Sequence, residues 1–411
     1  MAEITVNFDR LQSEIEELAN IGRSDDGGLY RMAFSAGDME ARNWFIQRVI
    51  DAGFDAQVDG AGNIHGRHNW DDKHASVMTG SHLDTVPGAG HLDGALGVLC
   101  GLEALRSLKE SGVALRYPLE AVAFSDEEGR FGGMLGSQAI CGRLTPETLY
   151  SARDLDGVSL VEAMADCGFN ATEVLRAQRA PGSIRAFVEL HIEQGPMLDH
   201  QGTSIGIVDM ITGLAKWNIR LIGAANHAGT TPMEMRRDAF LGLVELAGEI
   251  PRIIEEHGSP RSRATIGRVE LFPGVANVVP GRVEFSLDIR DTSSPVLQEL
   301  GDAFRRALSA IARRRELMFE FEVLSEIGPV RCDDMVTRAV HESVQAAGVS
   351  SIHISSGAAH DTQIMAGIAP AGMIFVPSKE GRSHSPAEWT SWDDIRNGAN
   401  VLTNTLRRLT S

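Results

Sequence analysis

One segment constrains the fold more than any other part of the sequence. A short apolar run, ASVMTG, leads into the polar stretch SHLDTVPGAGHLDG, and apolar residues then recur at helical spacing in ALGVLCGLEALRSLKESG. This order predicts a strand at 75–80, a loop, and a helix at 94–110. The loop carries His82, Asp84 and Asp93 beside the carboxyl end of the strand, where open α/β sheets bind ligands. His82 and Asp93 could bind a divalent metal there, and the Asp84 carboxylate could accept the other ring N–H of His82.

The alternation of strands and helices continues on both sides of this segment. Short apolar runs predict further strands at 119–124, 186–193 and 372–376. Apolar residues at helical spacing predict further helices at 9–20, 38–52, 333–347 and 391–409. Strands that alternate with helices form a sheet with helices packed on it. We therefore expect an α/β fold with a mixed, largely parallel sheet.

The pattern changes after Met210. Strand-like alternation in LAKWNIRLIG is followed by a helix at 237–257 and two strand patterns, TIGRVELF and NVVPGRVEFSLDIR. A helix at 295–313 and the strand MFEFEVL complete the order βαββαβ, which is that of the ferredoxin-like split βαβ unit. We predict that this α+β unit is an inserted domain. The predicted boundaries give a discontinuous α/β domain, residues 1–211 and 327–411, and an inserted domain, residues 212–326.

The composition limits the partners and the compartment. The chain has 411 residues and a formal charge of −18, so nucleic acids and anionic membranes are not expected as partners. The first residues, MAEITVNFDR, lack the features of a secretory signal peptide, and no apolar run reaches transmembrane length. The four cysteines are widely spaced and form no CxxC pair, so we expect a reducing, cytoplasmic location.

Two adjacent glutamates follow the predicted strand at 119–124. In FSDEEGRFGG, Glu127 and Glu128 repel each other unless positive charge lies nearby. A metal bound by Glu128, with Glu127 as the general base that moves a proton, would relieve this repulsion. Two solvated loop carboxylates are the alternative for this pair. Asp93 could likewise be only the N-cap of the helix that follows it.

Two histidines follow other strands. His191 ends the strand in ELHIEQGP, and His384 lies in a Gly/Ser/Pro loop after GMIFVPS. Taken alone, His191 could be a core residue and His384 a surface residue. A pair of divalent ions about 3.5–4 Å apart needs one bridging carboxylate, for which Asp93 is the candidate. We predict five ligands for such a pair of ions: His82, Asp93, Glu128, His191 and His384.

Several long motifs carry a family resemblance. They are GSHLDTVP with HLDG, DEEGRF, HIEQGP, NHAGTTPM with RRDA, FPGVANVVPGRVEFSLDIR, SGAAHDTQ and VPSKEGRSHSPAEW. Through these motifs, nearly the whole chain resembles the M20 metallopeptidase clan, and more narrowly its hydantoinase/carbamoylase branch. That branch includes N-carbamoyl-L-amino acid hydrolases, β-ureidopropionases and allantoate amidohydrolases.

The resemblance implies how two divalent ions per subunit are held. One ion would be bound by His82, Asp93 and His191, and the other by Asp93, Glu128 and His384. Glu127 would be the general base. Zn²⁺ suits such histidine and carboxylate ligands best, and Mn²⁺, Co²⁺ or Ni²⁺ are also feasible.

The resemblance also implies that the inserted domain is a lid and the surface of a homodimer. His227 would reach the partner subunit's active site and polarise the scissile carbonyl. Asn277 and Arg290 would bind the substrate carboxylate, for which the guanidinium fork is suited. Further substrate contacts implied by the resemblance are Gln194, the Gly357 backbone and His360, with Asp361 beside it.

Two motifs depart from the usual pattern of the branch. The branch usually reads EEGSRF, whereas Glu127–Phe131 is EEGRF and lacks the serine. Gly357–Thr362 reads GAAHDT in place of GAGHDA. The metal ligands are intact, so these changes bear on the shape of the substrate loops.

These observations predict a metal-dependent amidohydrolase. Its substrate would be an N-carbamoyl-L-amino acid, whose ureido C–N bond is cleaved by water held at the metals. The alternatives are an allantoate amidohydrolase, a dipeptidase or aminoacylase of the same clan, and a non-catalytic, metal-stabilised dimer module. The NHAGTTPM and FPGVANVVP motifs favour the carbamoylase branch over peptidases, and Glu127 beside a full ligand set argues against a non-catalytic module.

Overall fold

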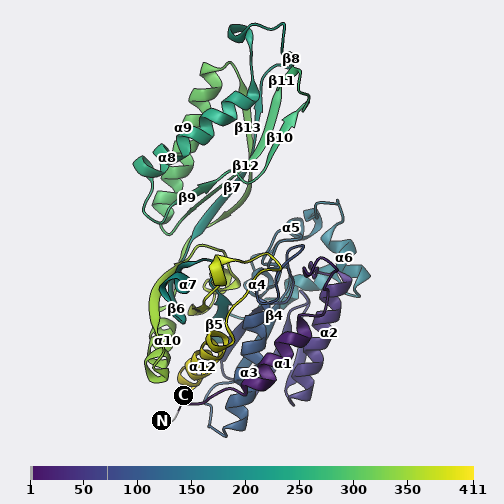
Figure 1. Cartoon of the computed structure of the whole chain (residues 1–411). Helices are drawn as coiled ribbons and strands as arrows, with labels where there is room; N and C mark the ends of the chain where they lie inside the picture. The colour runs from purple at the N-terminus through teal and green to yellow at the C-terminus, as the bar shows by residue number, and fades with distance from the viewer. Residues whose placement is uncertain (1–2, 72) are drawn as a thin grey trace. The chain divides into compact units, whose positions relative to one another are not determined.

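The chain divides into two compact units. A computed structural model describes residues 3–71 and 73–411. The larger unit comprises the chain up to Asp209 together with Arg331–Ser411, and the smaller unit comprises Met210–Val330 (Figure 1). Among the described residues, no helix combines the length and apolar character needed to span a membrane.

A mixed sheet of nine strands forms the centre of the larger unit. Its strands, in order across the sheet, are β1 (Asp55–Val58), β2 (Ile64–His68), β4 (Leu119–Phe124), β3 (Ser76–His82), β5 (Ile184–Ile192), β16 (Ala371–Val376), β6 (Ile205–Ile211) and β14 (Val330–Arg331), with β15 (Ser351–Ser356) paired to β6. The four central strands, β4, β3, β5 and β16, are parallel, whereas β1, β2 and β6 pair in antiparallel fashion. The predicted α/β fold with a mixed sheet is confirmed.

Helices cover both faces of this sheet. One face packs against α1 (Phe8–Leu18), α2 (Ala36–Asp51), α3 (Ala95–Glu110), α10 (Asp334–Ala347) and α12 (Trp392–Leu409). The other face packs against α4 (Leu135–Ile140) and α11 (Asp361–Met365). Successive residues of β5 point to opposite faces, so Val188 joins the first core and Phe187 the second. Because both faces are buried, apolar residues predominate in β4 and β16, whereas β3 and β5 also contain buried polar residues such as Thr79 and Glu189.

Several short elements lie outside the sequence prediction. They are α5 (Pro146–Ser151), α6 (Leu160–Asp166), α7 (Met197–Gln201) and the 3₁₀ turns η1 (Ala171–Ala177), η2 (Met233–Met235) and η3 (Lys379–Gly381). Elements of one or two turns are too short to show a helical period in the sequence. Their ends are marked instead by local hydrogen bonds, such as the capping boxes that begin at Thr145 and Ser159.

The smaller unit is a twisted antiparallel sheet with two helices on one face. Its main elements, in chain order, are β7 (Gly213–Ile222), α8 (Ala239–His257), β10 (Val269–Phe272), β12 (Arg282–Asp291), α9 (Ser294–Arg314) and β13 (Met318–Ile327). The strand order is β10-β12-β7-β13, with the short β9 (Arg263–Thr265) also paired to β12. This order and the βαββαβ sequence of elements are those of the split βαβ unit.

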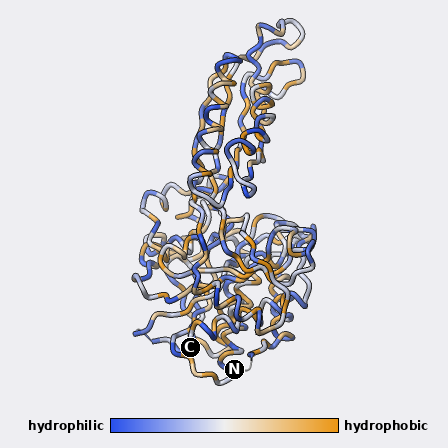
Figure 2. Tube along the Cα trace, turned by 90° about the vertical axis from the view of Figure 1, so that its left-hand side faces the viewer, coloured by the Kyte–Doolittle hydropathy of each residue, from blue (hydrophilic) through white to orange (hydrophobic). Residues whose placement is uncertain are grey.

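Alternation along β12 decides which of its side chains meet the two helices. Phe285 and Ile289 are buried against α8 and α9, whereas Asp288 and Arg290 lie on the opposite, more open face. Figure 2 shows hydrophilic and hydrophobic residues interspersed along the helices of this unit. A separate two-stranded ribbon, β8 (Asn226–His227) with β11 (Val278–Val279), completes the unit.

Candidate metal centre

The predicted ligands gather where four parallel strands end. β3 pairs with β4 so that His82 lies opposite Phe124, and β16 pairs with β5 so that Phe375 lies opposite His191. The carboxyl ends of all four strands therefore meet at one edge of the sheet. The segments that follow β4 and β16, and the loop between β3 and α3, supply the remaining ligands.

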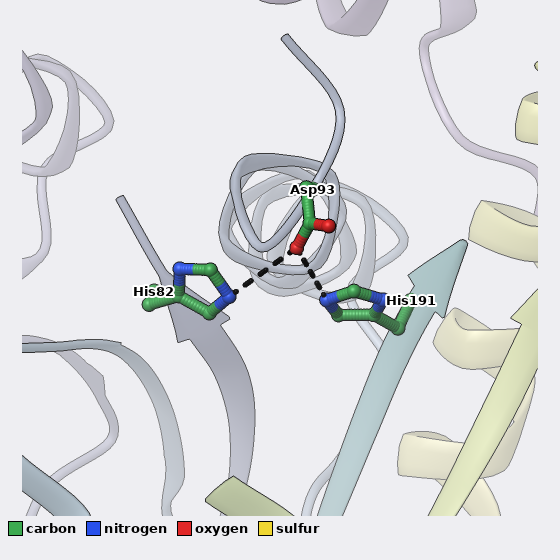
Figure 3. Close-up of side chains that lie close together, drawn as sticks. All are labelled: His82, Asp93 and His191. Atoms are coloured by element: carbon green, nitrogen blue, oxygen red, sulfur yellow. Dashed lines mark ion pairs between the residues drawn. The ribbon is translucent and has the colours of Figure 1, made fainter. Parts of the chain in front are cut away.

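Two histidines and one aspartate form a buried cluster at this edge. The Asp93 Oδ1 atom lies 3.2 Å from His191 Nε2 and 3.6 Å from His82 Nε2. All three side chains are at most 3% exposed. Figure 3 shows the two rings, from neighbouring strands, pointing at one carboxylate. One donor atom from each residue lies within 4.8 Å of the others, which suits a single metal ion.

The second oxygen of Asp93 belongs to another cluster. Asp93 Oδ2 lies 3.4 Å from His384 Nε2, and Glu128 Oε2 lies 3.5 Å from the same nitrogen. These three residues form a second set of potential ligands. The Gln194 side-chain amide donates to Asp93 Oδ2 at 2.6 Å. Because each oxygen of Asp93 faces a different cluster, this carboxylate has the arrangement of a bridging ligand.

Hydrogen bonds orient both buried rings. The Nδ1 atoms of His82 and His191 each lie 2.9 Å from a main-chain carbonyl, those of Asp84 and Ile192. Carbonyls accept, so both rings carry a proton on Nδ1, and the neutral form of each ring has its lone pair on Nε2. The main-chain N–H of Gly94 donates to His191 Nε2 at 3.1 Å, which also identifies that atom as an acceptor. In their neutral form, both rings therefore present the Nε2 lone pair to a cation.

The prediction for the Asp84 carboxylate was wrong. It lies 4.0 Å from His82 Nδ1, and the main-chain carbonyl of the same residue takes the ring N–H instead. β3 ends at His82, so the two-residue period of a strand no longer relates these side chains. The Asp84 carboxylate instead accepts the main-chain N–H groups of Glu127, at 3.3 Å, and Glu128, at 3.1 Å. It positions the loop that bears both glutamates.

Asp93 is not the N-cap of the helix that follows it. α3 begins at Ala95 and its N-cap is Gly94, with φ at 63°. A Cβ atom on Gly94 would lie 2.4 Å from the His82 ring, so only glycine allows this approach. The Asp93 carboxylate is thereby left to the two clusters.

Burial and crowded charge shift the pKa values of the site. Burial opposes ionisation of Asp93, but the surrounding imidazoles outweigh it and hold the pKa of this carboxyl well below its usual range. Burial and the Asp93 charge raise the pKa of Glu128 to about 7. The hydrogen bond to Asp93 raises the pKa of His384 to about 9. A bound cation would replace the protons that balance these charges.

The two adjacent glutamates have different surroundings. Glu128 belongs to the second cluster, whereas Glu127 Oε2 lies 3.6 Å from His82 Nε2. Burial, followed by the nearby carboxylates of Asp361 and Glu128, raises the pKa of Glu127 well above its usual value, although His82 opposes this. A carboxylate with a raised pKa can take up a proton near neutral pH.

Sequence reasoning missed two residues that join the loop after β16 to Asp93. The buried carboxylate of Glu388 accepts the main-chain N–H groups of Leu92, at 2.7 Å, and Asp93, at 3.1 Å. Ser383 donates to Asp93 Oδ2 at 2.6 Å and to Glu388 Oε2 at 3.1 Å. The position of Glu388 four residues after His384, in one motif, was the signal that could have identified it.

Backbone conformation is unusual at three positions in the site. Asp126, Gln194 and His384 have φ between 51° and 57°, in the left-handed region that disfavours side chains. Such residues cost of order 1–3 kcal/mol each and persist where the surroundings hold them in place. The strain is concentrated in the segments that bear Glu127, Glu128 and His384.

His360 lies beneath the first cluster. Its ring is 2% exposed and its centroid is 4.7 Å from that of His191. Together with Glu189, the two histidines form a third group of potential ligands. Glu189, however, already accepts hydrogen bonds from Ser81, at 2.7 Å, and Thr362, at 2.6 Å. The structure thus places His360 against His191, and its contact with substrate stays a prediction.

The other predicted residues near His360 have contrasting surroundings. Gly357 is exposed in the turn after β15, whereas Asp361 is fully buried at the start of α11. Burial, followed by the charge of Glu189, raises the pKa of Asp361 well above its usual value. The substrate contact predicted for the Gly357 backbone stays a prediction.

The smaller unit carries the three remaining predicted residues. His227 is exposed, and its Nδ1 atom accepts the main-chain N–H groups of Gly229, at 3.1 Å, and Thr230, at 3.2 Å. When the ring is neutral, its proton is therefore on Nε2, which can donate to an oxygen. Asn277 lies next to β8, where its carbonyl accepts the N–H of Ala228. Arg290, on β12, is paired with Asp288 at 2.8 Å.

Comparison with known proteins gives consistent matches over most or nearly all of the chain. Residues 78–408 match the family described as "Peptidase family M20/M25/M40". The chain is 40% identical to an N-carbamoyl-L-amino acid amidohydrolase of Geobacillus stearothermophilus, over 98% of this chain and 99% of the relative. It is 37% identical to an allantoate amidohydrolase of Bacillus subtilis, over 96% of each chain.

Comparison with a solved structure agrees with these sequence matches. The amidase of the hydantoinase/carbamoylase family from Burkholderia multivorans superposes with a TM-score of 0.88, at 35% identity, over 99% of this chain and 98% of that one. Its fold and the sequence matches agree with the strand-end arrangement of histidines and carboxylates described above. The chain therefore belongs to peptidase family M20/M25/M40, in the hydantoinase/carbamoylase branch of amidohydrolases, which hydrolyse C–N bonds other than peptide bonds.

Proposed function

We propose that this protein hydrolyses the ureido C–N bond of N-carbamoyl-L-amino acids with two divalent metal ions per subunit. The observation that carries the proposal is the Asp93 carboxylate, whose two oxygens face two separate groups of ligands. A relative with 40% identity is named for this activity. The products would be the amino acid, ammonia and carbon dioxide.

The donor set fits a pair of divalent cations. Two neutral imidazoles and a bridging carboxylate are typical ligands of Zn²⁺, and Mn²⁺, Co²⁺ and Ni²⁺ accept the same donors. His82, Asp93 and His191 would hold one ion. The other would be held by Asp93, Glu128 and His384. When bound, such ions lower the pKa of water and polarise the carbonyl under attack.

The protein's own groups would move the proton. Glu127, with its raised pKa and its position beside His82, would take a proton from the attacking water and pass it to the leaving nitrogen. Asp84 would hold the Glu127 loop in place through the main-chain hydrogen bonds described above. Gln194, already bonded to Asp93, would contact the substrate from the same side.

The smaller unit would act as a lid and as the surface of a homodimer. His227, with a donor at Nε2, would stabilise the developing oxyanion in the partner subunit's site. Arg290 would exchange Asp288 for the substrate carboxylate, assisted by Asn277. The exposed apolar side chains of Phe240 and Val244 on α8 support a partner on this unit, as does the outer edge of β10, which pairs with no strand among the described residues.

An ammonia assay tests the reaction. Purified enzyme is loaded with Zn²⁺ or Mn²⁺ and given a panel of N-carbamoyl-L-amino acids, allantoate and dipeptides, with and without chelator. We expect ammonia from the carbamoyl compounds, and its loss on chelation. Preference for allantoate would support the activity for which the Bacillus subtilis relative is named. Cleavage of dipeptides alone would support the peptidase alternative, and no turnover would support the non-catalytic alternative.

The expected compartment is the cytoplasm, where the four cysteines would stay unpaired. These are Cys100, Cys141, Cys167 and Cys332.

A further inference from the structure

A cavity of about 460 Å³ adjoins the metal centre within the larger unit. Asp84 and Glu128 form part of its lining, and both belong to the site already described. A group attached to the reacting carbon or nitrogen could therefore extend from the metal centre into this cavity. The cavity shares no residue with the smaller unit.

The rest of the wall is mainly apolar. Met32, Phe34, Val86 and Leu155 line it, from three separate segments of the chain. Phe34 is buried, whereas Met32 and Val86 are half-buried and Leu155 is fully exposed, at 106%. Covering apolar surface that faces water with an apolar ligand is favourable, in proportion to the area covered. These side chains therefore favour a nonpolar occupant.

Hydrogen bonds hold the walls of the cavity together. The Arg130 guanidinium donates to the Asp154 carboxylate, at 3.0 Å, and to the main-chain carbonyl of Ala33, at 2.7 Å. Asp154 in turn accepts the N–H of Asp156 at 3.0 Å, which closes the turn that presents Leu155. Three segments are thus tied together by one side chain, and a preformed cavity loses less entropy on binding.

The charges around the cavity select against anions. Among the described residues, the lining includes the acidic side chains of Asp84, Glu128, Asp154 and Asp156 and one cation, Arg130, which is paired with Asp154. At the end of the cavity formed by Asp154 and Asp156, a second carboxylate on the substrate would meet negative charge, because Arg130 is already paired. An uncharged side chain would meet the apolar wall instead.

We propose that this cavity is the subsite for an uncharged, apolar side chain of the substrate. N-carbamoyl derivatives of leucine, methionine and phenylalanine would then be better substrates than those of glycine or aspartate. This inference rests on the proposed function, because the ureido group must lie at the adjoining metal centre. It deepens that function by naming the substrate class.

A substrate panel tests the inference. We would measure kcat/KM for the N-carbamoyl derivatives of glycine, leucine, phenylalanine, aspartate and lysine. Each buried side-chain carbon is expected to raise kcat/KM about fourfold, so that leucine, with four more carbons, exceeds glycine by up to about 250-fold. Leu155→Ala and Val86→Ala should lower the leucine-to-glycine ratio about three- to tenfold. Leu175→Ala, an exposed leucine outside this cavity, is the matched control and should leave the ratio unchanged.

A cavity-filling variant and a binding measurement complete the test. Val86→Trp should slow the leucine and phenylalanine derivatives while it spares the glycine derivative. Equal rates for glycine and leucine, a preference that both alanine variants leave intact, or a preference for lysine would each overturn the inference. Dissociation constants measured on Glu127→Gln report the subsite without turnover. If the enzyme does not catalyse the reaction, tighter binding of the leucine derivative than of the glycine derivative would still support the subsite. Equal dissociation constants for the two derivatives would overturn it.

Discussion

The Ser383 hydroxyl donates to Oδ2 of Asp93 at 2.6 Å, although 290 positions separate the two residues in the chain. The same loop carries His384, a potential ligand beside that oxygen, and Glu388, which accepts the main-chain N–H of Asp93. These hydrogen bonds join the loop after β16 to the loop before α3 without the need for a cation. They therefore help to set the distance between the Asp93 carboxylate and His384.

Glu388→Ala should weaken metal binding about 10- to 100-fold, because partners that orient ligands contribute this much. Two buried main-chain N–H groups would lose their acceptor in this variant. Glu388→Gln keeps one carbonyl oxygen and should restore most of the affinity. Calorimetric titration with Zn²⁺ or Mn²⁺ measures the effect. An alanine variant that unfolds more easily without metal but binds metal normally would contradict this role.

Glu127→Gln should keep both metals and lose about two to four orders of magnitude in turnover, because the amide cannot accept the proton. Ammonia release measures turnover, and elemental analysis of the same sample counts metal. Glu322→Gln, an exposed glutamate on β13, is a control that should keep full activity. Near-normal turnover in Glu127→Gln would rule out the proposed base.

Asp93→Ala should lose both metals, whereas His384→Ala should lose one. The reason is that the two oxygens of Asp93 face different clusters, while His384 faces only the second. Elemental analysis after dialysis against a weak chelator gives the metal content per chain. Equal metal content in the two variants would contradict the bridging arrangement.

Arg290→Lys should raise KM for N-carbamoyl amino acids about 10- to 100-fold with little change in kcat. Lysine keeps the charge but loses the two-pronged hydrogen bonding to a carboxylate. Arg282→Lys, on the same strand and the same face, serves as the control because its side chain is exposed. Steady-state kinetics with both variants separates the two parameters. An unchanged KM would remove Arg290 from the carboxylate site.

His65 should stabilise the fold below neutral pH more than above it. Burial lowers its pKa, but the carboxylates of Asp59, at 3.3 Å, and Glu120, at 3.0 Å, outweigh this and raise it to about 9. The charged ring therefore contributes fully below its ordinary pKa of about 6.5, and the contribution is lost as pH rises through 9.

Comparison with His65→Gln tests the predicted direction of this pH dependence. Urea unfolding of the metal-free proteins at pH 6 and pH 10 gives the difference in free energy of unfolding at each pH. We expect that difference to shrink by about 3 kcal/mol at the higher pH, since each unit of pKa shift is worth about 1.4 kcal/mol. A difference that stays constant with pH would contradict the prediction.

The sequence predicted those parts of the fold that have long, regular patterns. The strands at 119–124 and 186–193 and the helix at 94–110 match β4, β5 and α3 to within two residues. β1, at the edge of the sheet, and β2, beside it, were not predicted, because strands of four and five residues have little apolar pattern. α4 and α6 were not predicted for the same reason of length.

The sequence allowed us to predict which residues gather at the candidate site better than which hydrogen bonds they form there. Parallel strands must bring their carboxyl ends together, so His82 and His191 could be placed side by side from the sequence. The hydrogen-bond acceptor for the His82 ring could not be predicted. The strand ends at that residue, and the main-chain carbonyl of Asp84 lies closer to the ring than the Asp84 carboxylate does. The hydrogen bonds of Glu388 depend on loop conformations that no local pattern encodes.

The order of the ligands along the chain has a consequence for synthesis on the ribosome. His82, Asp93 and His191 all precede residue 210, so the strands that present the first cluster are translated before the smaller unit begins. His384 comes near the end of the 411-residue chain. A nascent polypeptide would thus acquire the donors for one cation long before those for the other. The second half of the centre is complete only once translation is nearly finished.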